Sequence, residues 1–202
     1  MKKTSKTDPI ENSTVWRQAL RREMVNRRLA LTVEMHAEFS AAIVAHLVER
    51  LPQLATAVVG FCWPIKNEPD VRAALDAWRR QGGRAALPVV VEEAAPLAFR
   101  AWEPDTPLLP DRYGIPTPDS GDWLVPDALL LPLNAFDGAG YRLGYGGGFF
   151  DRTLAALAPR PLAVGVGFEM NRVDTIRPEP HDQRLDWIVT EAGAFPMRLK
   201  GF

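Results

Sequence analysis

The sequence predicts a single α/β domain of three layers (α/β/α), in which a mostly parallel central sheet lies between helices. Three observations lead to this fold class. A length of 202 residues suits one domain. Short, continuously apolar runs of the buried-strand type recur along the chain, and segments with helical spacing of apolar residues alternate with them. We expect residues 1–12 to form a disordered lead and residues 13–202 to form the domain.

Four helices are expected. Ser13 or Thr14 can cap the first, and Thr32 can cap the second. Apolar residues at helical spacing predict a third helix over residues 70–81, which a pair of glycines follows. A fourth helix is expected over residues 149–157, directly after a glycine-rich segment.

Six buried strands are expected between and after these helices. The proline-rich stretch from residue 104 to residue 126 predicts an ordered loop, because no change in composition separates two cores there. In parallel sheets of this kind, ligands bind where loops leave the carboxyl ends of the strands. The apolar runs that predict the strands span residues 56–62, 84–91, 96–102, 128–133, 162–168 and 186–193.

Composition narrows the possible functions. One cysteine, Cys62, excludes an internal disulfide and favours a reducing compartment, so we expect a cytoplasmic protein. One thiol and three histidines make a structural zinc site unfavourable. No apolar run approaches the ~18 residues of a membrane span. Residues 1–31 hold eight basic residues against three acidic ones. Such a helix suits a nucleic acid, a membrane surface or a small polyanion, and a solvated helix face is the alternative.

The segment FDGAGYRLGYGGGFFDR, residues 136–152, contains six glycines between a predicted strand and a predicted helix. Glycines let backbone N–H groups approach a ligand, and the start of a helix attracts anions. The segment lacks the Gly-Lys-Ser/Thr of a P-loop, and the pattern G-x-G-x-x-G fails at Phe149. It therefore predicts a phosphate-binding loop of another kind, and the alternative is a tightly packed turn. Asp151 is either a Mg²⁺ contact or a charge that stabilises the helix dipole.

Pro132, followed closely by AFDGAGYRLGYGGGFFDR, resembles the signature of the 5-formyltetrahydrofolate cyclo-ligase family, whose members are also called methenyltetrahydrofolate synthetases. The resemblance extends to RQAL and Arg21 in the first helix, to FCWPIKNEPD with Glu68, and to YGIPTP. It also includes VGVGFEMNRVDTIRPEPHD, with Asp182, and the DWIVTE that comes after it. The resemblance covers about residues 14 to 191.

The resemblance implies an ATP-dependent closure of 5-formyltetrahydrofolate to 5,10-methenyltetrahydrofolate, with release of ADP and phosphate. The formyl oxygen would be phosphorylated, N10 would attack, and phosphate would leave. Such a site positions two substrates and neutralises phosphate charge without a protein nucleophile. The implied partners are a reduced folate and ATP, with Mg²⁺ as cofactor. Neither nucleic acid, a membrane nor an obligate protein partner is implied.

The resemblance also assigns site residues. Arg142 would be catalytic, and Asp151 and Asp182 would contact Mg²⁺. Phe149 and Phe150 stand where the family often has tyrosine, and some members have lysine in place of Gly147. The implied ATP-binding residues are Arg17, Gln18, Ala19, Leu20, Arg21, Arg142, Leu143, Gly144, Tyr145, Gly146, Gly147, Gly148, Phe149 and Phe150. The implied folate-binding residues are Trp63, Glu68, Tyr145, Gly146, Gly147, Gly148 and Phe149.

Other interpretations stay open at this point. Trp63 is alternatively a core residue, and Glu68 a surface residue. The same fold class also includes sugar-phosphate isomerases and CoA-transferases, which need a carboxylate or lysine base but not ATP. A non-catalytic nucleotide- or RNA-binding protein would use the basic helix, and RNA recognition usually adds exposed aromatic side chains.

Overall fold

The structure is a computed structural model that describes residues 9–197. Its centre is an eight-stranded sheet in the order β13-β12-β10-β7-β1-β2-β3-β6. Five strands in the middle of this sheet are parallel: β1 (Val58–Gly60), β2 (Arg84–Val89), β7 (Ala128–Pro132), β10 (Leu162–Val166) and β12 (Trp187–Thr190). Antiparallel pairs add β3 (Ala98–Trp102), β6 (Trp123–Leu124) and β13 (Gly193–Pro196) at the edges. The predicted α/β class with a mostly parallel sheet is confirmed.

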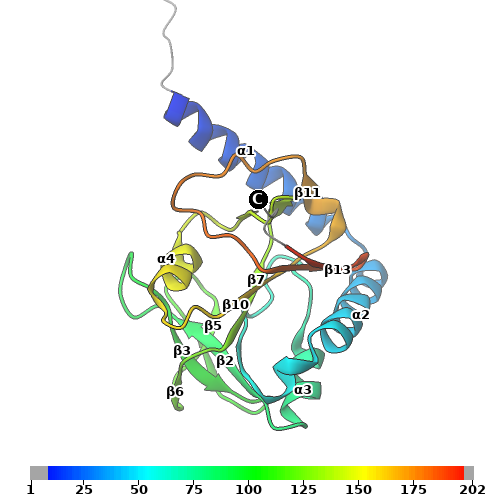
Figure 1. Cartoon of the computed structure of the whole chain (residues 1–202), viewed down its shortest axis with the longest axis vertical. Coiled ribbons are helices and arrows are strands. Elements are labelled where there is room, and N and C mark those ends of the chain that lie inside the picture. The colour runs from blue at the N-terminus through cyan, green and yellow to red at the C-terminus, as the bar shows by residue number, and fades with distance from the viewer. Residues whose placement is uncertain (1–8, 198–202) are drawn as a thin grey trace, which may run out of the picture.

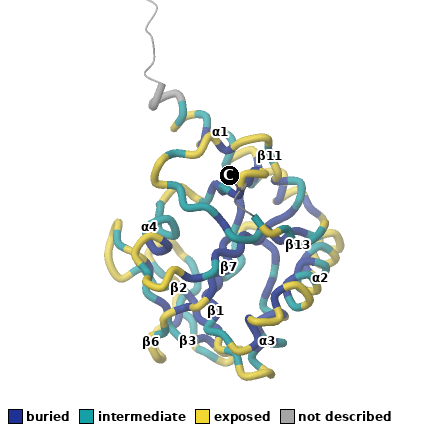
Figure 2. The backbone as a smooth tube through the Cα atoms, in the orientation of Figure 1, coloured by how far each residue is buried: buried dark blue, intermediate teal, exposed yellow. Residues whose placement is uncertain are grey.

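Helices cover both faces of the sheet (Figure 1). The helices α2 (Val33–Arg50) and α3 (Arg72–Arg79) share one core cluster with the sheet, and α4 (Phe149–Ala156) belongs to the cluster on the other face. The strand β7 contributes side chains to the core on both faces of the sheet. Leu130 packs in the first cluster, and Leu129 and Leu131 pack in the second. The strands at the centre are accordingly the most buried part of the chain (Figure 2).

The first helix, α1 (Pro9–Leu29), lies across the top of the sheet (Figure 1). It begins four residues before Ser13, so the predicted start at Ser13 or Thr14 is wrong. Proline is tolerated in the first turn of a helix, where its missing N–H would have no partner. The hydroxyl of Ser13 instead donates to Glu179, at 3.2 Å. Residues 1–8 of the predicted disordered lead lie outside the described residues.

The remaining predicted elements are confirmed with shorter bounds. Thr32 caps α2 by accepting a hydrogen bond from the Met35 N–H.

Within residues 9–197 no single helix is long and apolar enough to cross a membrane, and only α1 and α2 taken together as a bent pair pass that test.

Several short elements were not expected from the sequence. The proline-rich stretch contains β4 (Leu108–Pro110) and β5 (Pro116–Pro118), which pair with each other, as well as β6. The glycine-rich segment contains β8 (Ala135–Asp137) and β9 (Arg142–Leu143), which form a small sheet with β11 (Arg172–Val173). Two 3₁₀ turns, η1 (Pro52–Thr56) and η2 (Glu169–Asn171), complete the order.

The strand order places the ligand site. Across the sheet, the five parallel strands stand in the order β2-β1-β7-β10-β12. The order reverses between β1 and β7, and open α/β sheets bind ligands at such a switch point, beyond the carboxyl ends of the strands. The loops after β1 and β7, residues 61–71 and 133–148, therefore leave the sheet on either side of the position where a ligand is expected.

Candidate active site

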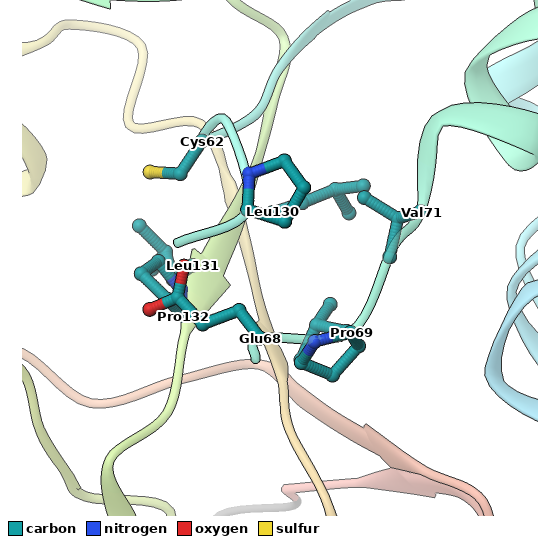
Figure 3. Close-up of a pocket in the computed structure, with 9 residues that line it drawn as sticks. Cys62, Glu68, Pro69, Val71, Leu130, Leu131 and Pro132 are labelled. Atoms are coloured by element: carbon teal, nitrogen blue, oxygen red, sulfur yellow. The ribbon is translucent and has the colours of Figure 1, made fainter. Parts of the chain in front are cut away.

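A small cavity of about 20 Å³ lies at this switch point (Figure 3). Residues after β1 line it together with the ends of β7 and β10, and Glu68, Cys62 and Pro132 are among them. Burial raises the pKa of the Cys62 thiol, and the charge of Glu68 adds to this effect. The thiol is therefore neutral, and Glu68 is the ionisable group of interest in the cavity wall.

Glu68 is buried, with 4% of its surface exposed, and two hydrogen-bond donors and one nearby cation hold its carboxylate. The Tyr145 hydroxyl donates to Oε1 at 2.6 Å, and the Ile65 N–H donates to Oε2 at 3.1 Å. Arg28, which is 1% exposed, donates from Nη2 to the Tyr145 hydroxyl oxygen at 3.0 Å, and the same Nη2 lies 3.7 Å from Oε1. The alternative that Glu68 is a surface residue is therefore excluded.

Burial raises the pKa of Glu68, while the Tyr145 hydrogen bond and the charge of Arg28 act in the opposite direction. Burial and the neighbouring carboxylate raise the pKa of Tyr145 as well, so the phenol keeps its proton and donates it to Glu68. The cluster is thus a buried carboxylate with a defined donor, next to an exposed loop. Such a carboxylate can accept hydrogen bonds from N–H groups of a ligand.

The turn before Glu68 has an uncommon backbone. Lys66 and Asn67 have φ angles of 48° and 60°, a region that non-glycine residues occupy at some energetic cost. Asn67 donates from its side chain to the Arg28 carbonyl at 3.2 Å. The Lys66 ammonium lies 5.1 Å from the centre of the Tyr145 ring. The turn therefore places a cation beside the exposed face of Tyr145, at the entrance to the Glu68 cluster.

The glycine-rich loop exposes residues 145–147 and leads directly into α4. Gly146 and Gly148 have φ angles of 98° and 66°, and no side chain caps the first turn of α4. Two arginines bind carbonyl groups of the loop: Arg21 Nε donates to Gly144 at 2.9 Å, and Arg152 Nη2 donates to Gly147 at 2.9 Å. An exposed loop, an uncapped helix start and two cations together suit an anion such as phosphate.

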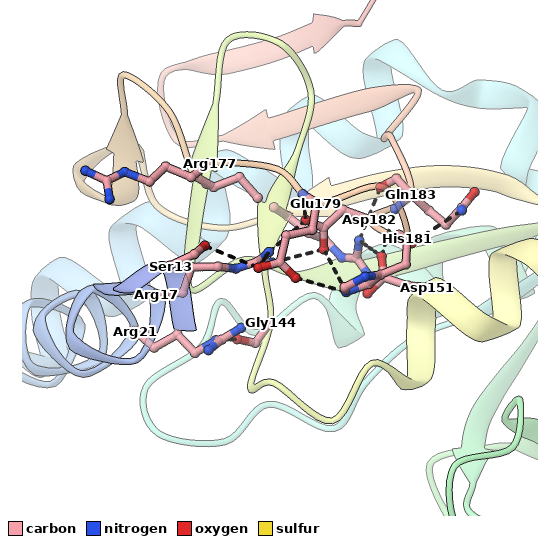
Figure 4. A network of polar contacts seen from close by, with 12 residues as sticks. Ser13, Arg17, Arg21, Gly144, Asp151, Arg177, Glu179, His181, Asp182 and Gln183 are labelled. Atoms are coloured by element: carbon pink, nitrogen blue, oxygen red, sulfur yellow. Dashed lines mark hydrogen bonds and ion pairs between the residues drawn. The ribbon is translucent and has the colours of Figure 1, made fainter. Parts of the chain in front are cut away.

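A second polar network joins α1 to the segment before β12 (Figure 4). Both terminal nitrogens of Arg17 donate to the two oxygens of Asp182, each at 3.0 Å. Arg17 also lies 3.3 Å from Glu179, which accepts from Ser13. Arg17 is 6% exposed, so this fork is a buried ion pair. In the structure Arg17 is bound to Asp182, and its implied contact with ATP stays a prediction.

Arg21 is one helical turn further along α1 and is only partly buried. Burial, and next the charge of Arg17, lower the pKa of Arg21. Two neighbouring cations repel each other, and an anion bound between them would relieve that repulsion. Arg21 therefore fits the implied contact with phosphate better than Arg17 does.

The two implied metal contacts are each bound by a different buried arginine, Asp151 by Arg142 and Asp182 by Arg17. Arg142 Nη1 donates to Asp151 Oδ1 at 3.1 Å, and the Gln183 N–H donates to the same oxygen at 2.9 Å. No group of three or more His, Cys, Asp or Glu residues able to hold a metal occurs within residues 9–197. Mg²⁺ needs only one or two carboxylates when it also binds phosphate. Asp151 fits that role, whereas both oxygens of Asp182 are bound by Arg17.

The other implied residues are not all brought together. Gln18 and Ala19 are exposed on α1, and Leu20 packs against the small apolar cluster beneath that helix. Leu143 belongs to the same cluster, and its side chain is buried there. Their implied part in ATP binding stays a prediction.

The implied aromatic residues are divided between core and surface. Trp63 is partly buried and packs edge-on against Trp102, with ring centres 6.3 Å apart, at the border of the core cluster that α2 and α3 share with the sheet. Phe149 and Phe150 both pack against the cluster on the opposite face, and the ring centre of Phe149 also lies 6.0 Å from that of the exposed Tyr113. Phe149 thus reaches the surface beside the loop, while the folate contact of Trp63 stays a prediction.

Sequence reasoning missed Arg28, Asn134 and Lys66 as parts of this site. Arg28 Nη1 donates to the buried Asn134 Oδ1 at 3.0 Å, which connects α1 with the segment after β7. A signal was present in the helix, because Arg17, Arg21 and Arg28 are spaced by four and seven residues and so share one face.

Comparisons with known proteins identify the family of this chain. The family model described as the 5-formyltetrahydrofolate cyclo-ligase family matches residues 13–191. A 5-formyltetrahydrofolate cyclo-ligase of Escherichia coli is 32% identical over 171 residues, which cover 81% of this chain and 94% of that protein. The solved structure of Aquifex aeolicus 5,10-methenyltetrahydrofolate synthetase matches with a TM-score of 0.78 and 26% identity, covering 92% of this chain and 95% of that one.

The solved structure of a Mycoplasma pneumoniae 5,10-methenyltetrahydrofolate synthetase shares the fold, with a TM-score of 0.72 and 24% identity over 87% of this chain and 98% of that one. The family model covers nearly all of the described domain, including both loops of the switch point. This chain therefore belongs to the 5-formyltetrahydrofolate cyclo-ligase family of enzymes.

Proposed function

We propose that this chain uses ATP to close 5-formyltetrahydrofolate into 5,10-methenyltetrahydrofolate, releasing ADP and phosphate. The observation that carries the proposal is the buried Glu68–Tyr145 pair, with an O···O distance of 2.6 Å, beside the exposed glycine-rich loop at the switch point. One half of this site suits the N–H groups of a folate, and the other half suits phosphate. Both substrates of the proposed reaction thus find complementary chemistry where the loop after β1 meets the glycine-rich loop.

On the nucleotide side, the backbone of residues 144–148 and the first turn of α4 would face the triphosphate. Arg21 is the cation best placed for phosphate oxygens, since it already lies against the loop at Gly144. Arg142 holds Asp151 at the start of α4. When bound beside the phosphates, Mg²⁺ supplies charge neutralisation, and Asp151 is the residue that would hold it.

On the folate side, Glu68 would accept hydrogen bonds from ring N–H groups of the pterin. Tyr145 holds one oxygen of Glu68 and Ile65 holds the other. Each carboxylate oxygen can accept more than one hydrogen bond, so the pair retains capacity for a ligand. Phe149 and Tyr113 offer an apolar edge beside the loop for the rest of the substrate.

With the substrates in place, the γ-phosphoryl group would pass from ATP to the formyl oxygen and leave ADP. N10 would then attack the formyl carbon and lose its proton, and the C–O bond would break to release phosphate. The residues of this chain contribute position and charge, and no side chain needs to form a bond with the substrate.

The arrangement of α1 favours this enzyme over an RNA-binding protein. Arg17 and Arg28 account for two of the basic residues of the helix, and both face inward and are buried. Arg27 is exposed but forms an ion pair with Glu23 at 2.6 Å. The helix therefore directs its charge toward the site more than toward a surface that could bind a nucleic acid backbone.

The test is a turnover assay that follows the absorbance of the methenyl product with and without ATP. Product that forms only when ATP and Mg²⁺ are present would support the proposal. Glu68→Gln is expected to raise KM for the folate by roughly tenfold or more, because it removes a buried charge from a hydrogen-bonded site. Glu23→Gln, a change at an exposed glutamate of α1, serves as the control. A wild-type protein that forms no product would refute the proposal.

A further inference from the structure

Arg28 is buried more completely than any other charged residue in the described chain, and each of its three nitrogens donates at least one hydrogen bond. Nε donates to the Lys66 carbonyl at 2.8 Å. Nη1 donates to Asn134 Oδ1 at 3.0 Å and to the Leu133 carbonyl at 3.4 Å. Nη2 donates to the Tyr145 hydroxyl at 3.0 Å and lies 3.7 Å from Glu68 Oε1. One side chain of α1 thus reaches the loop after β1, the segment after β7 and the glycine-rich loop.

These contacts fix the direction of the hydrogen bond between Tyr145 and Glu68. The Tyr145 hydroxyl oxygen accepts from Arg28, so its own hydrogen is free to point away from the guanidinium. That hydrogen points to Glu68, at an O···O distance of 2.6 Å. Without Arg28 the hydroxyl could rotate, and Glu68 would lose both a nearby positive charge and its oriented donor.

We propose that Arg28 is a positioning residue for the folate site: it keeps Glu68 ionised and Tyr145 oriented, and so sets folate affinity and the lower pH limit of folate binding. This inference rests on the proposed function. A guanidinium suits the task because its planar fork makes several directed hydrogen bonds at once and never loses its charge in this pH range. Arg28 does not touch the expected reacting atoms, and it acts through Glu68 and Tyr145.

The sign of the pH effect follows from the charges around Glu68. Burial raises the pKa of Glu68, and the charge of Arg28 lowers it. Removing that charge moves the pKa further up, so Glu68 would take up a proton at a higher pH and stop accepting from the folate. The groups that face Glu68 are Arg28 of α1, His36 of α2 through the Glu68 carbonyl, Lys66 and Cys62 of its own loop, and Tyr145.

The experiment measures KM for 5-formyltetrahydrofolate and the pH dependence of kcat/KM in Arg28→Gln, Arg28→Lys and wild type. Arg27→Gln is the matched control, since Arg27 is the adjacent residue of the same helix and is exposed. Arg28→Gln is expected to raise KM for the folate by roughly tenfold to a hundredfold, the range for losing a buried hydrogen bond to a charge. The acid limb of its pH profile is expected to move to higher pH.

Arg28→Lys keeps a cation but loses the fork, so its acid limb should move less than that of Arg28→Gln while its KM still rises. If Arg28→Gln does not fold, Tyr145→Phe supplies the second test, because it removes the same oriented donor and should move the acid limb in the same direction. Variants that turn over with the wild-type acid limb would overturn the inference. A wild type with no ATP-dependent turnover would instead refute the proposed function, so the two failures are distinguishable.

Discussion

The buried ion pair between Arg17 and Asp182 is one of the contacts that hold α1 to the domain, and Arg17→Met tests its contribution. The two side chains are 7% and 5% exposed, and both N···O distances are 3.0 Å. Removing the arginine leaves the Asp182 carboxylate buried, with the Glu179 N–H as a remaining donor at 2.7 Å. Breaking a buried pair from one side costs about 3–5 kcal/mol. We expect the lower end, about 3 kcal/mol, because that donor persists.

The free energy of unfolding from urea denaturation is the quantity to measure. In a chain of this length, about 3 kcal/mol corresponds to a fall in Tm of roughly 6–12 °C. The double variant Arg17→Met/Asp182→Leu is expected to recover most of the loss, because it replaces the pair with apolar side chains and leaves no buried charge. Arg27→Met is the control, and it should cost about 0.5 kcal/mol or less, since Arg27 forms only an exposed pair with Glu23.

The same variant separates two roles for Arg17. If Arg17 serves mainly to hold Asp182 and α1, Arg17→Met loses stability and KM for ATP changes little. A variant that keeps the wild-type free energy of unfolding to within about 1 kcal/mol but binds ATP more weakly would refute this reasoning. It would show that the fork opens in solution and that the arginine turns to the nucleotide.

Three further outcomes are expected. Gly165→Ala should lower the free energy of unfolding by roughly 1–3 kcal/mol, because a Cβ there would lie 2.6 Å from Leu185 Cδ1; an unchanged urea midpoint would contradict it. The Arg72 hydrogen bond lowers the pKa of Asp70, so Asp70 contributes stability above its unfolded-state pKa that is lost as pH falls through the folded-state pKa. Wild type should therefore lose more stability than Asp70→Asn below about pH 4, and parallel stability curves would argue against the assignment. Asp151→Asn should raise the Mg²⁺ concentration for half-maximal turnover by roughly tenfold; an unchanged Mg²⁺ dependence would remove Asp151 from the metal site.

The central strands could be predicted from sequence because their residues are buried on both faces. In β7, Leu130 contacts one core cluster and Leu129 the other, so a continuous apolar run is the only pattern that suits the strand. The small sheet of β8, β9 and β11 lacks such a pattern. Asp137 organises it by accepting from the N–H groups of Ala139 and Tyr141 and, far along the chain, of Ile176. A partner 39 residues away leaves no local signal.

The inner face of α1 escaped prediction for a different reason. Periodicity analysis counts apolar residues, whereas this face carries Arg17, Arg21 and Arg28 with Met24 between them. These residues are spaced as i, i+4, i+7 and i+11, which is the spacing of a buried helical stripe. The arginines face inward because carboxylate and carbonyl groups of distant loops accept their hydrogen bonds, as Asp182 does from Arg17. The basic excess of the sequence was visible, but its direction depended on the fold.

The Glu68 cluster shows what Arg28 on this face contributes to the site. The Glu68 carboxylate is 4% exposed, and Tyr145, Ile65 and Arg28 offset its loss of hydration. An apolar group of similar volume often gives equal or greater stability at a buried site. The neighbouring turn adds strain at Lys66. Folding alone accounts for neither feature. Both occur at the switch point of the sheet, within reach of the exposed glycine-rich loop, which is where a folate and a triphosphate have to meet for the proposed reaction.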